Sequence, residues 1–297
     1  MMRPVYKIMF VVSIILTIAA IVIVGKFGLI YGVDFRGGSV MEVGFSGDRP
    51  HPQEMADVIN SVEGVSGATV SPVGDKEAII RLNDLSEKIH QDVLIKISEK
   101  FNKVTETRFD SIGPAVGNEL KQKSIRAIII VLLAIIIYLA FVFRKLSGVL
   151  SPWAMGLAAV FALIHDVMVP TAVFALLGHY AGIEITAVFV AAALTILGYS
   201  VSDSVVVFDR IRENILRFGT KDNFGQTVHK SIMQTLVRSL ATNFTVLLSL
   251  LAIYFFGGES IKYFSLALII GIFLGAYSSI FIASPILVWW NGRRSRR

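Results

Sequence analysis

Four ionisable side chains lie inside the long apolar segments of this 297-residue chain, namely His165, Asp166, Asp203 and Arg238. Each such group costs about 2.5–3.5 kcal/mol at the centre of a membrane helix, so it is expected to face a protein interior and to find a partner. We interpret the four residues as an ion relay. The alternative is that they are satisfied polar residues that only hold helices together.

Asp203 and Arg238 have matching positions on two consecutive apolar segments, 183–208 and 232–256. At a rise of 1.5 Å per residue, both lie about 8–9 Å inside the ends that face their common loop, so an ion pair between them is feasible. Burial disfavours a charged carboxylate and a nearby cation favours it. A movement that separates the pair would therefore let Asp203 take up or release a proton.

His165 and Asp166 fall near the middle of the apolar segment 152–177, and Pro170 follows four residues after Asp166. The proline ring clashes with the carbonyl of residue 166 in a regular helix, so a kink is expected there. Backbone freed by a kink, next to a carboxylate, predicts a place for water or a cation.

The composition indicates that the four ionisable residues are carried by membrane-spanning segments. The chain is 54% hydrophobic and 17% charged, with a mean hydropathy of +0.68, whereas soluble domains are about 45–50% apolar and about 25% charged. It is therefore predicted to be an integral membrane protein. Six stretches reach the roughly 20 apolar residues that a membrane span requires: 8–30, 125–143, 152–177, 183–208, 232–256 and 263–290. The apolar run of the first is too long for a cleaved signal peptide, so it is interpreted as an anchor.

Several classes of function are excluded or disfavoured. The chain has no cysteine, which excludes disulfides and thiolate metal sites, and it has no phosphate-binding loop of the usual glycine patterns. ATP is therefore not expected to be hydrolysed on this chain, and we expect no cofactor, no metal site and no enzymatic activity. Its net charge of +6 is interpreted as a signal of membrane orientation rather than of nucleic-acid binding.

Lysine and arginine in the short loops predict the orientation, because they accumulate on the cytoplasmic side. They place both termini in the cytoplasm and residues 31–122 outside. The predicted domains are an N-terminal segment with the first span (1–30), the outer domain (31–122), the other five spans (123–290) and a basic tail (291–297). The charges used are Arg3, Lys7, Arg144, Lys145, Arg210, Arg212, Arg217, Lys221, Lys230, Arg293, Arg294, Arg296 and Arg297.

The outer segment has the pattern of a small α+β domain. Strand-forming and helix-forming stretches alternate in the order βαββαβ, which is typical of a ferredoxin-like sandwich. No metal pattern or acid–base pair is evident, so the domain is interpreted as a binding or coupling module. The expected strands are 39–45, 67–73, 77–82 and 103–112, and the expected helices are 51–64 and 85–101.

Small residues at steps of three or four mark two faces on which helices can approach closely. The stripe in 183–208 is expected to place Asp203 at a tight helix interface. Its members are Ala187, Ala191, Thr195, Gly198 and Ser202, and the second stripe, in 263–290, contains Gly271, Gly275, Ser279 and Ala283.

These residues also carry a family resemblance that extends in order over nearly the whole chain. The chain resembles the SecF branch of the SecD/SecF family in bacterial protein secretion, which is similar to half of a resistance-nodulation-division (RND) transporter. The segments that carry the resemblance are "GVDFRGG" (32–38), "SIGPAVGNELKQKS" (111–124), "LIHDV" (163–167), "GYSVSDSVVVFDRIREN" (198–214), "QTLVRS" (234–239) and "FFGGESIKYFSLALIIGIFLGAYSSIFIASP" (255–285).

The resemblance implies a subunit of the bacterial inner membrane that uses the proton motive force to help preproteins complete translocation. Its implied partners are a SecD-like subunit, the SecYEG channel, SecA and preproteins, with lipid around the spans. Spans facing the SecD-like subunit are expected to be apolar all round, as 263–290 is. Two alternatives remain: a half-unit of an RND-type small-molecule exporter, and an assembly factor without ion coupling.

The resemblance also assigns residues. It matches Asp203 and Arg238 to the pair implicated in ion passage, although the familiar Asn-Asp-Thr reads Ser202-Asp203-Ser204 here, which leaves proton or sodium open. It marks Asp34, Gly37 and Gly38 as motif residues. The run Asp209, Arg210, Arg212 and Glu213 is either a coupling helix or a solvated cytoplasmic turn.

Overall fold

The computed structural model describes residues 4–101, 104–144, 151–218 and 223–294. Six of its helical segments are long and apolar enough to cross a membrane, which confirms the six predicted spans. The chain is therefore a multi-pass membrane protein. Arg3, Lys145, Lys221, Arg296 and Arg297, which entered the orientation argument, lie outside the described residues. The spans are α1 (Pro4–Phe27), α5 (Pro114–Val142), α6 (Pro152–Ala181), α7 (Ala187–Phe218), α8 (Phe224–Phe256) and a sixth made of α9 (Glu259–Ser278), η2 (Ser279–Ala283) and α10 (Ser284–Arg294).

The helices extend beyond the apolar segments that revealed them. The clearest case is α7, whose apolar run ends near 208 while the helix continues to Phe218. Two ion pairs at a spacing of three residues, Arg210 with Glu213 and Arg212 with Asp209, support this extension. These residues therefore form a helix continuous with the span rather than a turn or a separate helix along the membrane surface, and a role in coupling stays a prediction.

The sixth span contains a π-helical turn, η2. Such a turn inserts one extra residue into the helical repeat and is frequent at functional sites. The Ser284 hydroxyl donates to the carbonyl oxygen of Ser279 at 2.8 Å within this turn. The turn changes which face of the helix the residues on either side of it present.

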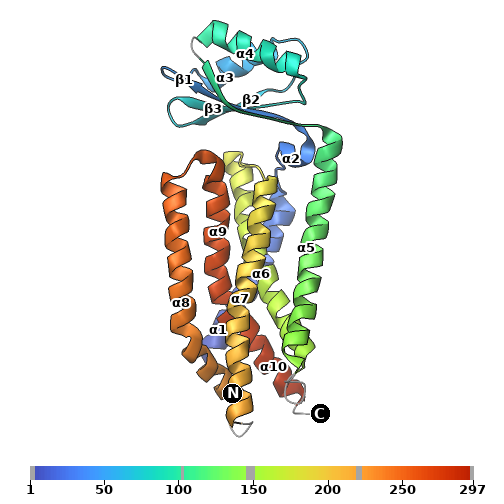
Figure 1. Cartoon of the computed structure of the whole chain (residues 1–297), viewed down its shortest axis with the longest axis vertical. Helices are drawn as coiled ribbons and strands as arrows, with labels where there is room; N and C mark the ends of the chain where they lie inside the picture. Colours follow the sequence, from blue (N-terminus) through green and yellow to red (C-terminus); the bar gives the residue numbers. More distant parts are fainter. Residues whose placement is uncertain (1–3, 102–103, 145–150, 219–222, 295–297) are drawn as a thin grey trace. The chain divides into compact units, whose positions relative to one another are not determined.

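The chain divides into two compact units. Residues 31–125 form the α/β unit, and residues 1–30 with 126–297 form the helical unit. Figure 1 shows the sheet of the first and the long helices of the second.

The α/β unit contains a four-stranded sheet in the order β2-β3-β1-β4, in which all neighbours are antiparallel. The predicted order βαββαβ is confirmed, preceded by a short helix, α2 (Val33–Arg36), that was not predicted. This topology agrees with a ferredoxin-like arrangement. The elements are β1 (Gly38–Phe45), α3 (Pro52–Asn60), β2 (Thr69–Val73), β3 (Glu77–Leu82), α4 (Glu87–Phe101) and β4 (Val104–Ile112).

Alternate residues of β1 and β3 supply one face of the sheet to a continuous apolar core. The helices α3 and α4 cover that face (Figure 1) and add Met55, Ile59, Val93 and Ile97 to the core. The strand residues in the core are Met41, Val43, Phe45, Ala78, Ile80 and Leu82. The alternation that predicted the strands is thus the alternation between core and solvent.

In the helical unit, the sixth span is the most buried of the candidate spans, with 61% of its apolar window inside the chain. Its α9 part packs against α6, α7 and α8. A Cβ at Gly271 would collide with Ile196, and one at Gly275 would lie 3.1 Å from the Ser200 Cβ. Gly271 and Gly275 of the second small-residue stripe therefore pack on α7. The apolar sides of α9 are covered largely by helices of this chain and not by a partner, contrary to the expectation for this span.

The α7 stripe behaves differently. Thr195, Gly198 and Ser202 are exposed in this chain, and a Cβ at Gly198 would meet no atom within 4 Å. Asp203 lies on the other, packed face of α7, where it is buried. No helix of the described residues covers this stripe, although Ser202 lines a cavity with Asp203, so the expectation that the stripe holds Asp203 in a tight interface stays a prediction.

Candidate functional site

The site is centred on Asp203, which α7 presents to α8 and to the sixth span. Its side chain is 8% exposed. The Ser279 hydroxyl, at the start of the π-helical turn, donates to Asp203 Oδ2 at 3.0 Å. A neutral hydroxyl compensates a buried charge only in part. The described surroundings of the Asp203 carboxyl therefore do not require it to be charged at all times.

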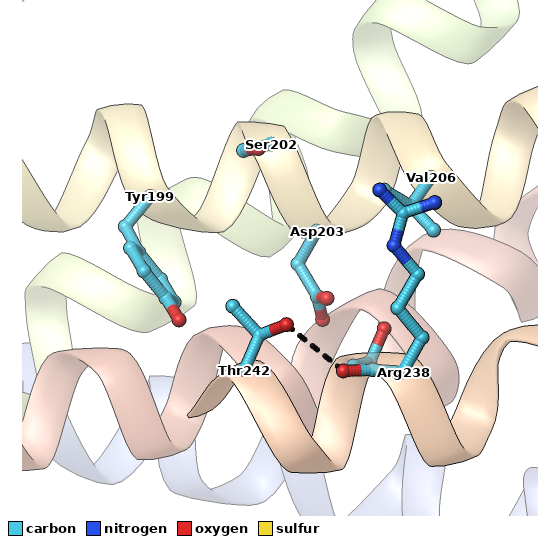
Figure 2. Close-up of a pocket in the computed structure, with 7 residues that line it drawn as sticks. Tyr199, Ser202, Asp203, Val206, Arg238 and Thr242 are labelled. Atoms are coloured by element: carbon cyan, nitrogen blue, oxygen red, sulfur yellow. Dashed lines mark hydrogen bonds between the residues drawn. The ribbon is translucent and has the colours of Figure 1, made fainter. Parts of the chain in front are cut away.

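A cavity of about 90 Å³ lies beside Asp203 between α7 and α8. Figure 2 shows Asp203 and Tyr199 extending from α7 toward α8, with Thr242 and Arg238 on the opposite helix. The lining is polar over much of its surface, with hydroxyl, carboxylate and guanidinium groups. The lining residues are Tyr199, Ser202, Asp203, Val206, Arg238, Ser239 and Thr242.

The structure brings Arg238 and Asp203 to the same cavity, as the matching depths predict. The guanidinium extends past Asp203 toward Val206 (Figure 2), and the described residues contain no ion pair between the two groups. The Arg238 side chain is exposed in this chain. The feasible ion pair is therefore not formed in this structure.

Asp166 and His165 form a second buried cluster. Asp166 is fully buried, and the Ser200 and Ser278 hydroxyls each donate to its Oδ2 at 2.6 Å. His165 Nδ1 lies 2.9 Å from Asp166 Oδ1, and the ring stacks on Tyr277. Asp166 thereby connects α6, α7 and α9, while α6 runs as one helix through Pro170.

Two consecutive serines link the two carboxylates. Ser278 donates to Asp166 and Ser279 donates to Asp203. Their positions flank the junction of α9 with the π-helical turn. Side chains of neighbouring residues in a regular helix diverge, yet here both reach the acids of two other helices. The sixth span is therefore the physical connection between the clusters.

Sequence reasoning did not single out Ser200, Ser278, Ser239, Tyr199 or Asn243. Ser200 precedes Asp203 by three residues, a spacing that places both on one helix face. Serines and a tyrosine are common in membrane helices, so the spacing alone is a weak signal. The signal in the structure is burial without partners: Tyr199 OH, Ser239 Oγ and Asn243 Oδ1 have no hydrogen-bond partner among the described residues.

The helical extension of α7 carries a third polar cluster at its Phe218 end. Arg210 Nε donates to Gln234 Oε1 at 2.8 Å, and Asn214 Nδ2 donates to Ser231 Oγ at 2.7 Å and to Gln234 Oε1 at 2.9 Å. Arg210 also pairs with Glu213. These contacts fasten α7 to α8, so the two helices that carry Asp203 and Arg238 are also joined beyond them.

The predicted motif residues Asp34, Gly37 and Gly38 lie in α2 and at the start of β1 in the α/β unit, far in sequence from the ionisable residues of the spans. Gly37 and Gly38 have φ values of 80° and 124°, which favour glycine. A Cβ at Gly37 would lie 2.6 Å from the Pro114 Cα. The two glycines therefore let the chain turn into β1 while touching the first turn of α5.

No group of three or more histidine or acidic residues arranged to hold a metal ion exists among the described residues. The site offers a carboxylate, an arginine and several hydroxyls, which is a set suited to moving a proton.

Comparisons with known proteins agree with these features. Residues 93–293 match the family described as protein export membrane protein SecD/SecF, C-terminal, and residues 22–48 match the SecD/SecF GG motif. The chain is 41% identical to a protein translocase subunit SecF of Thermobaculum terrenum, over 96% of this chain and 92% of that relative. It is 39% identical to one of Anaerolinea thermophila, over 95% and 91% of the two chains.

Two solved structures are similar over nearly all of the chain. A crystal structure of SecDF, titled a translocon-associated membrane protein, from Thermus thermophilus has a TM-score of 0.83 and 32% identity over 97% of this chain. SecDF in a super-membrane-facing form has a TM-score of 0.69 and 31% identity over 98% of this chain. The chain spans only 38% of the length of each of these SecDF chains.

Proposed function

This chain belongs to the SecD/SecF family of protein export membrane proteins, and on that premise we propose that it couples an ion gradient to the late stages of preprotein export. The family membership confirms the resemblance drawn from its motifs. Its relatives are named translocase subunits, which is a transport role. The observation that carries the proposal is Asp203, a buried membrane carboxylate beside a polar cavity that Arg238 also lines.

The coupling follows from the two positions that the Arg238 side chain can take. With the guanidinium against Asp203, the charged carboxylate is favoured, and with the guanidinium withdrawn, burial favours the neutral form. The present arrangement has the pair apart. A cycle between the two arrangements takes up one proton per Asp203 and releases it on the other side of the membrane.

A SecD-like partner completes the site in this proposal. The faces of α7 and α8 beside the cavity are exposed in this chain, and they carry small or polar residues rather than large apolar ones: Thr195, Gly198, Ser202, Arg238, Thr242 and Thr245. An arginine facing lipid is costly, and small residues allow another helix to approach closely. The larger size of the SecDF chains supports a second half that covers this face.

The α/β unit is proposed to hold the emerging preprotein on the extracytoplasmic side of the bacterial inner membrane. Its two edge strands differ: β2 contains Pro72, which has no N–H to donate, whereas β4 is a nine-residue edge. Pairing with β4 would bind an extended chain through main-chain hydrogen bonds, whatever its sequence. SecYEG and SecA would supply the channel and the cytoplasmic motor.

The central test replaces Asp203 in vesicles that contain the chain, its SecD-like partner, SecYEG and SecA. Asp203→Asn keeps the size of the side chain but removes its titrating proton. We expect the complex to assemble and late-stage export to fall to its level without a gradient. Export is measured under an imposed gradient of protons or of sodium, with Asp92→Asn, an exposed carboxylate of α4, as the matched control.

Arg238 gives an independent check. Arg238→Met should also remove gradient stimulation because the cation that favours the charged carboxylate is lost, while Arg238→Lys should keep part of it because the charge survives without the planar fork. Gradient-stimulated export at the normal rate by Asp203→Asn would refute the coupling and favour an assembly factor. Export of a small molecule in place of preprotein would favour the RND-type exporter.

The orientation is tested separately, with a cysteine introduced at the exposed turn between β2 and β3. Asp75→Cys in intact cells should react with a membrane-impermeant thiol reagent, because positive charges predict that residues 31–122 lie outside. Since the chain has no cysteine of its own, background labelling is absent. Labelling that requires cell lysis would reverse the topology.

A further inference from the structure

The sixth span contacts both buried carboxylates through two consecutive serines. Ser278 and Ser279 are fully buried. The Ser278 hydroxyl donates to Asp166 Oδ2 at 2.6 Å, and the Ser279 hydroxyl donates to Asp203 Oδ2 at 3.0 Å. In a regular helix, neighbouring side chains point about 100° apart. One span that reaches acids of α6 and α7 from adjacent positions therefore depends on the exact placement of its backbone.

The π-helical turn Ser279–Ala283 fixes that placement at the serine pair. Just before the turn, Ser278 is held by Asp166. Just after it, the Ser284 hydroxyl donates to the Ser279 carbonyl oxygen at 2.8 Å, five residues back, which is the repeat of a π-helical turn. The backbone of Ser279 is thus held from both sides.

The Ser279 hydroxyl has one proton and two acceptors within reach. Its Oγ lies 3.0 Å from Asp203 Oδ2 and 3.0 Å from the Ala276 carbonyl oxygen. A hydroxyl donates one hydrogen bond and can also accept. It can therefore donate to a charged Asp203, and it can accept from the O–H of a protonated Asp203 while donating to Ala276. One side chain thus offers a partner to both states of the carboxyl.

We propose that Ser279 is a positioning residue that pairs with Asp203 in both of its protonation states, and that Asp166 acts on Asp203 through Ser278 by fixing the start of the π-helical turn. The inference rests on the proposed function and specifies how its carboxyl is held while the proton comes and goes. Uptake forms one O–H bond on Asp203 and release breaks it, whereas Ser279 keeps its own proton and only turns it.

The two pairings of Ser279 differ in strength. A hydrogen bond to a charged carboxylate is about twice as strong as one between neutral groups, so this serine favours the charged form of Asp203. The positive charge of Arg238 acts in the same direction, and a charge on Asp166 acts against it. The charged or titratable groups around the carboxyl, on its own helix, on α8 and on α6, are Tyr199, Arg238, Asp166 and His165.

The first test removes the Ser279 hydroxyl in vesicles that contain the chain, its SecD-like partner, SecYEG and SecA. Late-stage export is measured as a function of the external proton concentration. Because Ser279→Ala takes away a donor to the charged carboxylate, half-maximal stimulation should move to a lower proton concentration, by on the order of 10-fold. Ser279→Thr keeps the hydroxyl and should keep the half-maximal concentration of the unaltered chain.

The second test asks whether Asp166 acts through the turn. Ser278→Ala leaves both acids and the Ser279 hydroxyl in place, and it should move the half-maximal concentration in the same direction by a smaller factor, about 3-fold. Added to Ser279→Ala, it should have no further effect, because the hydroxyl through which it acts is absent. Ser200→Ala removes the other hydroxyl that donates to Asp166 Oδ2, also at 2.6 Å, and its effect should add to that of Ser279→Ala.

Two further variants keep the test decisive. Ser265→Ala removes a buried hydroxyl of α9 that donates to the Ile261 carbonyl oxygen of the same helix, and it should leave the rate and its proton dependence unchanged. Complex assembly is measured in each preparation. If Ser278→Ala assembles poorly, Ser284→Ala takes its place with the same expectation, because it releases the other side of the turn.

The outcomes separate this inference from the proposed function. If Asp203→Asn abolishes gradient stimulation while Ser279→Ala keeps the proton dependence of the unaltered chain, the positioning role is wrong and the proposed function stands. If the effects of Ser278→Ala and Ser279→Ala simply add, Asp166 does not act through the turn. If Asp203→Asn keeps its stimulation, the proposed function itself fails.

Discussion

The α/β unit pairs its buried polar groups more completely than the described part of the helical unit does. In the α/β unit, the buried Ser39 bonds to Ser111 and to the Leu85 N–H, and the buried His90 contacts Glu87 and Glu106. One buried side-chain atom of this unit, Arg49 Nε, lacks a partner among the described residues. The described part of the helical unit has five: His165 Nε2, Tyr199 OH, Arg212 Nε, Ser239 Oγ and Asn243 Oδ1.

Paired and unpaired buried groups are expected to contribute differently to stability. A satisfied network fixes a single arrangement and contributes to stability. A buried group without a partner costs free energy unless water or another group pairs with it. Three substitutions test this distinction through the free energy of unfolding.

The largest effect is expected at Asp166, a buried carboxylate of the helical unit whose Oδ2 accepts two hydrogen bonds. Asp166→Ala removes the acceptor for Ser200 and Ser278 and should lower the free energy of unfolding by roughly 3 kcal/mol, since hydrogen bonds to charged groups are among the stronger ones. Thermal unfolding of the purified complex measures this, and Asp166→Asn, which keeps an acceptor, should lose less. An unchanged unfolding temperature in Asp166→Ala would show that the cluster holds no helices together.

An intermediate effect is expected at Ser39 in the α/β unit. Ser39→Ala leaves the buried Leu85 N–H without an acceptor and should cost about 1–2 kcal/mol. Hydrogen exchange of the Leu85 amide in the full chain is a direct measurement, because the exchange rate rises as local stability falls. Ser71, at the exposed edge strand β2, provides the control as Ser71→Ala, which should change exchange at Leu85 little.

The smallest effect is expected at Ser239. Because its hydroxyl has no partner among the described residues, Ser239→Ala should change the free energy of unfolding by within about 0.5 kcal/mol, or raise it, since removing an unpaired polar group is not a loss. The same thermal unfolding measurement applies. A loss as large as that of Ser39→Ala would mean that Ser239 has a structural partner, and the contrast between the units would fail at this position.

Much of the architecture follows from sequence because its signals are long and periodic. Six apolar runs predict six spans, and alternation of apolar residues around Gly-Asp at 74–75 predicts the β2–β3 hairpin. The candidate acids were also evident, because a carboxylate in an apolar run is costly and therefore conspicuous. The spans, the hairpin and the buried acids all depend on local composition, which can be read directly from one sequence.

The remaining features depend on tertiary packing. A stripe of small residues predicts close approach but not the identity of the neighbour, so it does not distinguish the buried Gly271 and Gly275 from the exposed Gly198. The π-helical turn at Ser279 has no known local pattern here, and it decides that Ser278 and Ser279 reach two different acids. The extension of α7 to Phe218 is stabilised by contacts with Gln234 and Ser231 of α8, which lie twenty residues or so away in sequence.

The pairing of β1 with β4 has a mechanical consequence. The chain enters the sheet at Gly38 and leaves it at Ile112, and these two residues are partners at one end of the same antiparallel pair. A force that draws the two connections apart would peel the sheet open one hydrogen bond at a time, which resists weakly. A force that pulls both connections in the same direction is instead shared by the two paired strands β1 and β4. The close fit of Gly37 on Pro114 lies at this end of the pair, so the backbone before β1 and the start of α5 are in contact where such a force would enter the sheet.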